Sequence, residues 1–358
     1  MPYCFDAKEK FSAILKNVED KRIPLWAHLD LTYKCNLNCI HCYCQGLSEG
    51  FSGSRPELSL EEIKRILGEL AEAGSLYLTL SGGEVFLRPD FFEIAEYAKR
   101  LRFCSTIFTN GSLVDGKIAK SIADLSPLAV EMSIYGATED IHDAVTQRKG
   151  SFKKLCRAVS LLKKENIKVV LKSVIMKNNF HQAKEIEDFS LQLGANDYHY
   201  TMEISPKNDG SRSPQEYQID DKEIRVLLSE NAVPIARGKP DYWDNPLDKP
   251  LCATGSLGCY ISPYGIIYPC AQLIIPMGDV RKNSFRQIWA RDSDLKKELS
   301  LLKTYADMPA CKSCKYLRSC KKCIGLAYLE TKDMKKCYNT IQSISRIDHE
   351  LSKSRGVI

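Results

Sequence analysis

The chain lacks the segments that would place it in or across a membrane. Its 358 residues contain no uninterrupted apolar run of the roughly 18 residues that a spanning helix needs. The first residues, MPYCFDAKEKF, lack the basic, apolar and small-residue regions of a secretory signal. We therefore expect a cytoplasmic protein that does not act at a membrane.

The chain also lacks a large excess of one charge. It has 51 Lys and Arg against 45 Asp and Glu, a net charge of +6, and we expect this charge to be spread through mixed Lys/Glu stretches. Such a pattern favours a solvated surface over a nucleic-acid-binding stripe, so no nucleic-acid partner is predicted. With 44% hydrophobic and 27% charged residues, the chain should form one large domain, or a main domain with an appended one.

Cysteine, in contrast, is abundant, with 15 residues. In a reducing compartment so many cysteines are not a disulfide framework. Three of them form a CX3CX2C group at Cys35, Cys39 and Cys42, and eight more lie between residues 252 and 337. We expect the other four to pack as small apolar side chains. They are Cys4, Cys44, Cys104 and Cys156.

Strand and helix patterns alternate from residue 25 onwards. Alternating apolar residues predict a strand at 25–32, and the first cysteine group follows it as a loop. Ser59 and Glu62 form a capping-box pattern at the start of a predicted helix, 59–74. The alternation continues with strands at 76–83, 105–111, 128–136, 168–176 and 197–204, and helices at 89–101, 116–125, 138–146, 151–165 and 182–194.

Six strand–helix alternations predict parallel strands joined by right-handed crossovers. A doubly wound open sheet and a barrel are both compatible with this order, and both place functional loops at the carboxyl ends of the strands. The cysteine group, the segment SGGE and the segment TNG all follow predicted strands. The domain prediction is an N-terminal extension, a barrel, a bridging segment, a cysteine-rich module and a C-terminal helix, at 1–24, 25–204, 205–250, 251–340 and 341–358.

The first cysteine group has two competing interpretations. A 4Fe–4S cluster is usually held by four thiolates, so a group of three leaves one iron open to a substrate or cofactor. Zinc also uses short cysteine spacings, but it would need a fourth ligand. His41 and Cys44 are the nearby candidates, and residues so close to Cys42 in sequence rarely reach round the same ion.

A CX3CX2C group after the first strand of a βα series resembles the signature of the radical S-adenosylmethionine (SAM) enzymes. The resemblance implies a partial (β/α)6 TIM-type barrel in the α/β class. It also implies that Cys35, Cys39 and Cys42 bind a 4Fe–4S cluster whose open iron is chelated by SAM. One electron from that cluster would cleave SAM to a 5′-deoxyadenosyl radical, which abstracts a hydrogen atom from the substrate.

The same resemblance suggests SAM-binding residues near the cluster. His41 occupies the place, before the third cysteine, of a residue that lies against the adenine. In LSGGE, the backbone and carboxylate of Gly82, Gly83 and Glu84 match a segment that binds the methionyl amino group. Glycines let the backbone come close, and a carboxylate neutralises an ammonium group.

Three further positions match the family less specifically. Ser133 corresponds to a contact with the ribose or carboxylate of SAM. Arg148 and Lys172 are alternative partners for that carboxylate, and for Arg148 a surface charge at a helix end is an equal alternative. The last predicted strand offers His199, Tyr200 and Glu203 as substrate contacts, which together with Tyr135 would supply a proton acceptor or hydrogen-bond partner. Core or rim packing is the alternative for each of them.

Eight cysteines in the C-terminal region make two complete four-thiolate sites, for which two zinc ions or two clusters are alternatives. The segments GIIYPC, GDVRKNSFRQIW and CKSCKYLRSC resemble the SPASM domain, a small cysteine-rich module of many peptide-modifying radical SAM enzymes. The resemblance implies two auxiliary 4Fe–4S clusters, three in all with the SAM cluster. Their ligands would be Cys252, Cys259, Cys270 and Cys323 for one, and Cys311, Cys314, Cys320 and Cys337 for the other.

The resemblance implies modification of a peptide or protein side chain as the leading function, by crosslinking, epimerisation or oxidation. Radical modification of a small molecule or tetrapyrrole, of the haem-pathway or aminoglycoside type, is the alternative. A non-catalytic iron–sulfur electron carrier or zinc scaffold is a third. Because only about 24 residues precede the first strand, we expect either a separate leader-binding protein as a partner or a substrate that is not a leader-bearing peptide. An electron donor such as flavodoxin or ferredoxin is a further expected partner.

Overall fold

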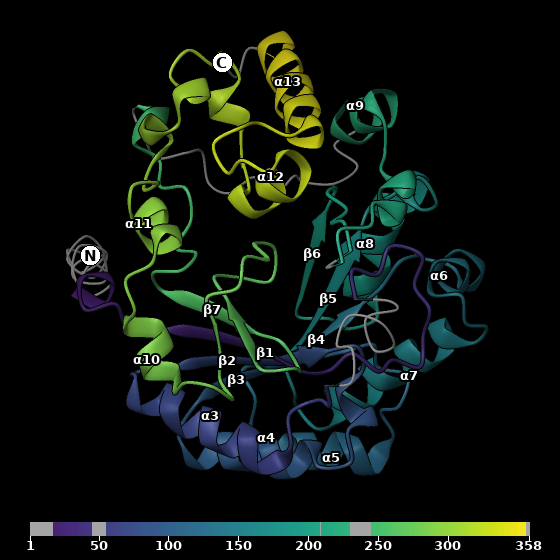
Figure 1. The fold of residues 1–358 in the computed structure, drawn as a ribbon. Helices are drawn as coiled ribbons and strands as arrows, with labels where there is room; N and C mark the ends of the chain where they lie inside the picture. Colours follow the sequence, from purple (N-terminus) through teal and green to yellow (C-terminus); the bar gives the residue numbers. More distant parts are fainter. Residues whose placement is uncertain (1–16, 45–54, 208, 230–244, 356–358) are drawn as a thin grey trace, which may run out of the picture.

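The computed structural model describes residues 17–44, 55–207, 209–229 and 245–355. A curved parallel sheet is covered on its outer side by helices (Figure 1). The six predicted strands are confirmed as β1 (Trp26–Thr32), β2 (Tyr77–Gly82), β3 (Cys104–Thr109), β4 (Ala129–Ser133), β5 (Val169–Val174) and β6 (Asp197–Thr201). The helices between them are α3 (Leu60–Glu72), α4 (Phe91–Arg100), α5 (Gly116–Leu125), α6 (Glu139–Thr146), α7 (Ser151–Lys164) and α8 (Ala183–Gln192).

Neighbouring strands pair in parallel in the order β6-β5-β4-β3-β2-β1, so the helices form the crossovers between adjacent strands, and α6 and α7 share the one between β4 and β5. The sheet stays open instead of closing from β6 to β1, which confirms the partial barrel. The first helix, α3, shows why the outer layer forms. Ser59 and Glu62 make the predicted capping box, and apolar residues at helical spacing face the core. Those residues are Ile63, Ile66, Leu67 and Leu70.

A seventh parallel strand belongs to the same sheet and comes from the cysteine-rich module. β7 (Gly258–Ile261) pairs in parallel with β1, with Trp26 opposite Gly258 and Leu29 opposite Ile261. β8 (Ile266–Tyr268) and β9 (Gly278–Asp279) then extend the sheet in antiparallel pairs. The sequence pattern does not predict the pairing of β7 with β1. This pairing joins the strands of the module and of the barrel in one continuous sheet.

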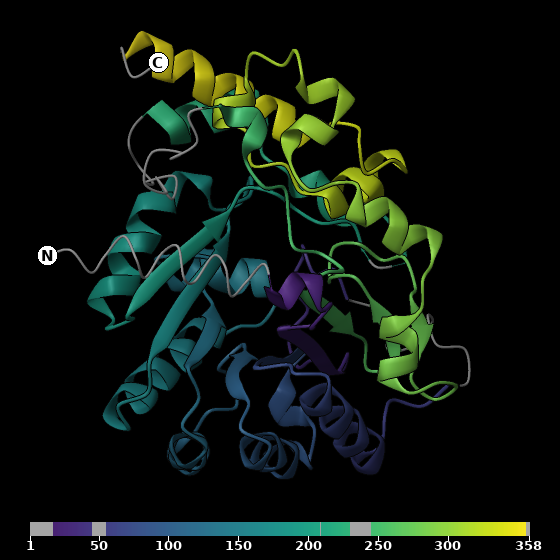
Figure 2. The same cartoon turned by 90° about the vertical axis from the view of Figure 1, so that its left-hand side faces the viewer.

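Most of the rest of the module packs over the carboxyl ends of the barrel strands, on the side away from α3, α4 and α5 (Figures 1 and 2), whereas its first helix contacts α3. Its helices are α10 (Phe285–Ala290), α11 (Asp294–Ser300), α12 (Ile324–Thr331) and α13 (Asn339–Ser354). α13 contacts α9 (Asp221–Ser229), where Ile347 joins a buried cluster with Ile224 and Leu228. Among the described residues no helix is both long and apolar enough to cross a membrane.

Candidate active site

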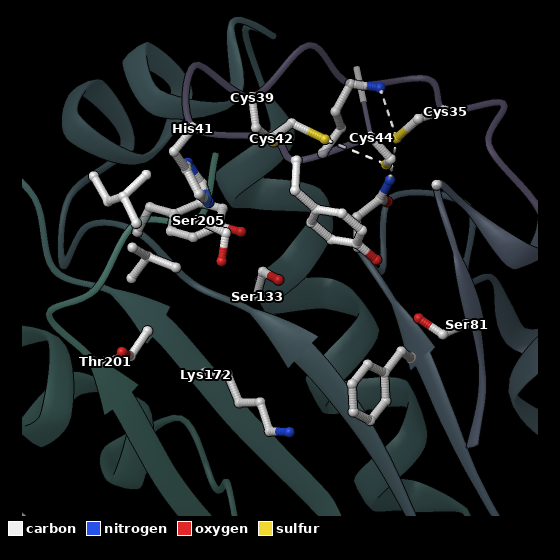
Figure 3. Close-up of a pocket in the computed structure, with 18 of the residues that line it drawn as sticks. Cys35, Cys39, His41, Cys42, Cys44, Ser81, Ser133, Lys172, Thr201 and Ser205 are labelled. Carbon is white, nitrogen blue, oxygen red and sulfur yellow. Dashed lines mark hydrogen bonds between the residues drawn. The ribbon is translucent and has the colours of Figure 1, made fainter. Parts of the chain in front are cut away.

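A cavity of about 540 Å³ opens at the carboxyl ends of the parallel strands. The cysteine loop forms one wall, and the ends of β2 to β6 form the floor (Figure 3). Three residues of the C-terminal module, Gln272, Cys323 and Leu326, complete the lining. One cavity therefore joins the barrel to the cysteine-rich module, at the strand ends where barrel enzymes place their chemistry.

Backbone hydrogen bonds fix the cysteine loop on both sides. The N–H groups of Gly83 and Glu84 donate to the carbonyls of Thr32 (2.8 Å) and Lys34 (2.9 Å), immediately before Cys35. On the other side, N–H groups at 38 and 40 donate to the carbonyls of residues 146 and 145 at the end of α6, at 3.0 Å each. The loop is thus positioned by β1, the end of β2 and α6 together.

The two glycines of LSGGE are required by this close packing. Gly82 has φ of +135°, and a Cβ there would lie 2.2 Å from the carbonyl oxygen of Thr32. A Cβ on Gly83 would lie 2.3 Å from the carbonyl oxygen of Lys34. Any larger residue at either position would displace the strand that leads into the cysteine loop.

The three thiols of the CX3CX2C group share the cavity wall. Burial raises the pKa of the Cys35 and Cys39 thiols, and the neighbouring cysteines of the group raise both further. A cationic centre would reverse this effect and hold them as thiolates, so the donor set fits an iron–sulfur cluster.

Of the extra cysteines that the structure describes, only Cys44 also lines the cavity. Cys44 is 4% exposed and its Sγ lies 3.4 Å from Sγ of Cys42. It packs with Tyr33 and Tyr264 in a small apolar cluster, as expected of a buried cysteine. Cys104 and Cys156 are half-buried, and Cys4 lies outside the described residues.

His41 presents an uncharged aromatic ring to the cavity. Burial lowers its pKa to about 4, and its ring meets Tyr135 edge-on with centroids 4.7 Å apart. Its Nδ1 is buried and has no hydrogen-bond partner among the described residues. A neutral ring with an unpaired nitrogen suits an adenine wall, and that role remains a prediction.

Glu84 has a different environment from the one that the resemblance implies. Its carboxylate is fully buried and accepts hydrogen bonds from the Thr109 hydroxyl (2.8 Å) and from the N–H groups of Asn110 (2.8 Å) and Phe86 (3.1 Å). It does not line the cavity, whereas Gly82 and Gly83 do. The carboxylate joins the ends of β2 and β3, and its contact with the SAM amino group remains a prediction.

Asn110, in the segment TNG, contacts the cysteine loop. Its Nδ2 donates to Oδ1 of Asn36 at 2.9 Å and approaches Sγ of Cys35 at 3.7 Å. The segment TNG therefore supports the first cysteine. The sequence offered one indication of this contact, because the segment TNG, like the cysteine group, follows a predicted strand.

Of the three residues that match the family less specifically, two line the cavity and one does not. Ser133 and Lys172 both line the cavity, and Figure 3 shows Lys172 farther from the cysteine loop than Ser133. Lys172 forms an ion pair with Glu131 and lies 4.3 Å from the ring centroid of Phe108. Arg148 is exposed between α6 and α7 and is not part of the lining, which corresponds to the surface-charge alternative.

Of the four expected substrate contacts, two line the cavity and two do not. Tyr135 and Glu203 line the cavity. His199 is exposed on β6 and Tyr200 packs toward the cluster formed by α9 and α13, so neither reaches the described lining. The Tyr338 hydroxyl donates a hydrogen bond to Glu203, and burial raises the pKa of that carboxyl group.

A buried carboxylate under the cysteine loop was missed by the sequence patterns. Asp30 on β1 is fully buried, and accepts hydrogen bonds from the hydroxyls of Tyr260 (2.8 Å) and Tyr43 (3.4 Å) and a contact from Nε2 of His28 (3.0 Å). Tyr43 follows Cys42, and Tyr260 lies on β7. Asp30 therefore connects the loop to the module. Polar residues at alternate positions of an apolar strand, HLD, were the signal for an interior-facing layer.

In the C-terminal module both thiol sets remain predictions. Burial raises the pKa of Cys311 to about 11, and Cys337, Cys320 and Cys314 of the same predicted set add to this effect. Burial likewise raises the pKa of Cys323 to about 12, and Cys270 adds to this effect. Burial also raises the pKa of Cys259 to about 12, but no cysteine contributes there. Its side chain packs in the barrel core, and its place as a ligand remains a prediction.

Comparisons with known proteins agree with this architecture. The family model of the Radical SAM superfamily matches residues 29–190, and that of SPASM, an iron–sulfur cluster-binding domain, matches residues 252–323. AdoMet-dependent heme synthase from Methanosarcina barkeri is 27% identical over 338 residues, covering 87% of this chain and 93% of that protein. The mycofactocin maturase MftC from Mycobacterium tuberculosis is 28% identical over 325 residues, covering 83% and 77%.

Among solved structures, anSMEcpe with bound AdoMet and Cp18Cys peptide aligns with a TM-score of 0.68 at 18% identity, covering 93% of this chain and 98% of that one. This likeness shows the shared fold. The chain is therefore a radical SAM enzyme, with SAM and an iron–sulfur cluster as its cofactors. More narrowly, it belongs to the radical SAM enzymes that carry a C-terminal SPASM domain with auxiliary clusters, which sets aside the carrier and zinc-scaffold alternatives.

Proposed function

We propose that this enzyme abstracts a hydrogen atom from a side chain of a peptide or protein, and so modifies it by crosslinking, epimerisation or oxidation. The observation that carries the proposal is the single cavity between the CX3CX2C loop and Cys323 of the SPASM domain. A substrate in this cavity would lie between the site of radical formation and an auxiliary cluster. A maturase among the relatives and a peptide complex among the similar folds support the same substrate class.

The charges of the cavity favour a peptide over a tetrapyrrole. Lys172 is the one Lys or Arg among its described lining residues, and Glu131 already neutralises it. Burial lowers the pKa of His41 and of His142 to about 4, so both are uncharged near neutral pH. A tetrapyrrole with several carboxylates would need several cationic partners in a buried site. Peptide amides need only neutral donors and acceptors.

Within this proposal, the residues that would bind the cluster and SAM have distinct roles. Cys35, Cys39 and Cys42 would hold the cluster, which supplies the electron that cleaves SAM. Backbone groups of Gly82 and Gly83 would meet the methionyl end of SAM, as the close approach there requires. His41 would lie against the adenine of SAM, and Ser133 would contact its ribose or carboxylate. Lys172 would lie at the floor of the cavity, and Glu84 would support the cysteine loop from behind.

The auxiliary thiol sets and the partners are proposed on the same basis. One cluster would use Cys252, Cys259, Cys270 and Cys323, and the other Cys311, Cys314, Cys320 and Cys337. A separate leader-binding protein would present the substrate. We propose this partner because the cavity offers a peptide few charged contacts, so a second protein would hold the peptide at the cavity.

A haem-pathway reaction is the second candidate, because the alignment with this chain covers 93% of the heme synthase relative but only 77% of the maturase. One experiment separates the two. Holoenzyme reduced with dithionite is incubated with SAM and either deuterated peptides encoded beside its gene or a deuterated iron porphyrin with four propionates. We expect deuterium in 5′-deoxyadenosine from a peptide, together with a mass change in that peptide. Deuterium from the porphyrin alone would overturn the proposal, and Cys104→Ser serves as a cysteine control outside the cavity.

A further inference from the structure

The net charge of the chain is concentrated in one short segment, contrary to the even spread expected from its composition. Residues 311–337 contain eight Lys and Arg against two Asp and Glu. This excess of six equals the +6 of the whole chain, so the remainder is balanced. Figure 1 shows the segment, in yellow-green to yellow, at the end of the molecule opposite α3, α4 and α5.

The cationic residues of this segment surround one thiol set. Each of its four cysteines has a lysine as its immediate neighbour in the chain, and adjacent Cα atoms lie about 3.8 Å apart. All four of these lysines are exposed. We call them the lysine collar: Lys312, Lys315, Lys321 and Lys336, beside Cys311, Cys314, Cys320 and Cys337 respectively.

A fifth lysine of the segment is buried. Lys322, between Lys321 and Cys323 in the chain, is 4% exposed, and its Nζ donates to the carbonyl of Lys335 at 2.8 Å. Lysine side chains of this segment therefore lie both at its surface and in its interior.

The other two thiol sets have no such surroundings. Of the three cysteines in the CX3CX2C loop, only Cys35 has a charged neighbour in the chain. In the second auxiliary set, Cys252, Cys259 and Cys270 have uncharged neighbours, and the lysine beside Cys323 is the buried Lys322. The collar is thus specific to one cluster site and is not a general property of the cysteine-rich regions.

We propose that the lysine collar is the docking surface for a small acidic electron-carrier protein, and that electrons enter the enzyme through the cluster of Cys311, Cys314, Cys320 and Cys337. In the step, the reduced carrier loses one electron and the cluster gains it, while no covalent bond forms or breaks. The inference does not depend on the substrate class, because cluster reduction precedes substrate chemistry.

Charge complementarity argues for this partner. Opposite charges steer diffusing proteins together and raise association rates by about 10- to 1,000-fold at low ionic strength. A carrier must also bring its redox group near the acceptor, and the collar places the attraction at a cluster site. A nucleic acid or an acidic leader peptide would match the charge but gives no reason for the lysines to be adjacent to the four thiols.

Stopped-flow reduction of the holoenzyme by reduced flavodoxin tests the proposal without any substrate. The Lys312→Glu/Lys315→Glu variant reverses two collar charges. The control is Lys117→Glu/Lys120→Glu, an equal charge change at two exposed lysines of α5 on the opposite end of the molecule. Reduction by dithionite, a small reductant that needs no docking, verifies that the clusters of each variant are intact.

We expect the collar variant to react with flavodoxin at least about tenfold more slowly than the wild type at low ionic strength. The difference should shrink as salt is added, because exposed charges are screened beyond about 10 Å at 0.1 M. The control variant should stay within about twofold of the wild type. Equal rates for the collar variant and the wild type, or equal losses in both variants, would overturn the proposal.

Discussion

The two cysteine-rich regions of this enzyme are built in opposite ways. In the first, Cys35, Cys39 and Cys42 lie on one short loop, fixed by backbone hydrogen bonds to residues 32–34 and to the end of α6. In the second, the cysteines come from separate segments between 252 and 337, and Cys311 and Cys320 share a buried apolar cluster against which Cys270 and Cys323 pack. The first region faces the cavity at the strand ends, whereas each cysteine of one set in the second has an exposed lysine beside it in the chain.

This difference corresponds to two chemical requirements. A radical must form where water is excluded and where SAM is held at a fixed position, so its cluster loop needs rigid backbone support. A cluster that exchanges electrons with a partner needs surface access and charge instead. The C-terminal region can therefore be spread over many segments without losing its function, while a small shift of the first loop would move the reacting atoms.

The largest expected effect comes from removing one ligand of the first region. Cys39→Ser should reduce SAM cleavage to background, because three thiolates are the minimum that holds this cluster with its open iron. Iron content should fall from about twelve to about eight per chain, since the two distal clusters persist. Assay of 5′-deoxyadenosine and of protein-bound iron measures both results.

Cys44→Ser is the matched control for that ligand. Cys44 is on the same loop, 3.4 Å from Cys42 between sulfur atoms, but it packs in an apolar cluster. Iron content and SAM cleavage should remain near the wild-type values. Iron loss as large as that of Cys39→Ser would show that Cys44 is a ligand, and the distinction between the two residues would fail.

The second prediction concerns the support of the loop. Gly83→Ala places a Cβ 2.3 Å from the carbonyl oxygen of Lys34, a backbone atom that cannot rotate away. We expect a loss of about 2–4 kcal/mol in the free energy of unfolding. Gly116→Ala on α5, where nothing lies within 4 Å of the added Cβ, should stay within about 0.5 kcal/mol of the wild type. Denaturant unfolding compares them, and equal values would contradict the close-packing argument.

The third prediction concerns the dispersed region, where the structure leaves Cys259 in the barrel core. Both Cys270→Ser and Cys259→Ser should lose about four of about twelve irons if both thiols bind one auxiliary cluster, as the resemblance implies. The SAM cluster should keep its electron paramagnetic resonance signal in both variants. Full iron content in Cys259→Ser alone would assign that residue to packing and leave its cluster with three thiolates.

Local patterns predicted what depends on residues close together in the chain. The six strands, the capping box of Ser59 and Glu62 and the position of the cysteine loop follow from periodicity and spacing over a few residues. The pairing of β7 with β1 could not be predicted this way, because it joins strands more than 200 residues apart in sequence. The burial of Asp30 was missed for the same reason, since Tyr260, one of its partners, is on β7.

The overall composition also does not show where in the chain the excess positive charge lies. A net charge of +6 over 358 residues looks even, yet residues 311–337 account for all of it. For Arg148, spacing along the chain gave its distance from Ser133 in residues but not the direction of its side chain, which the end of α6 determines. Side-chain direction and long-range pairing are properties of the folded chain, so they needed the structure.

The smallest expected effect compares Ser133 with Arg148 as SAM contacts. Ser133→Ala removes a hydroxyl from the cavity wall, and the loss of one hydrogen bond of about 1 kcal/mol should weaken SAM binding by about fivefold. Arg148→Ala removes an exposed charge outside the described lining, so SAM affinity should stay within about twofold of the wild type. Equilibrium binding of SAM to the unreduced holoenzyme measures both without turnover. A larger loss for Arg148→Ala than for Ser133→Ala would mean that the connection between α6 and α7 folds over the cavity when SAM binds, and that the first region is less rigid than its backbone hydrogen bonds indicate.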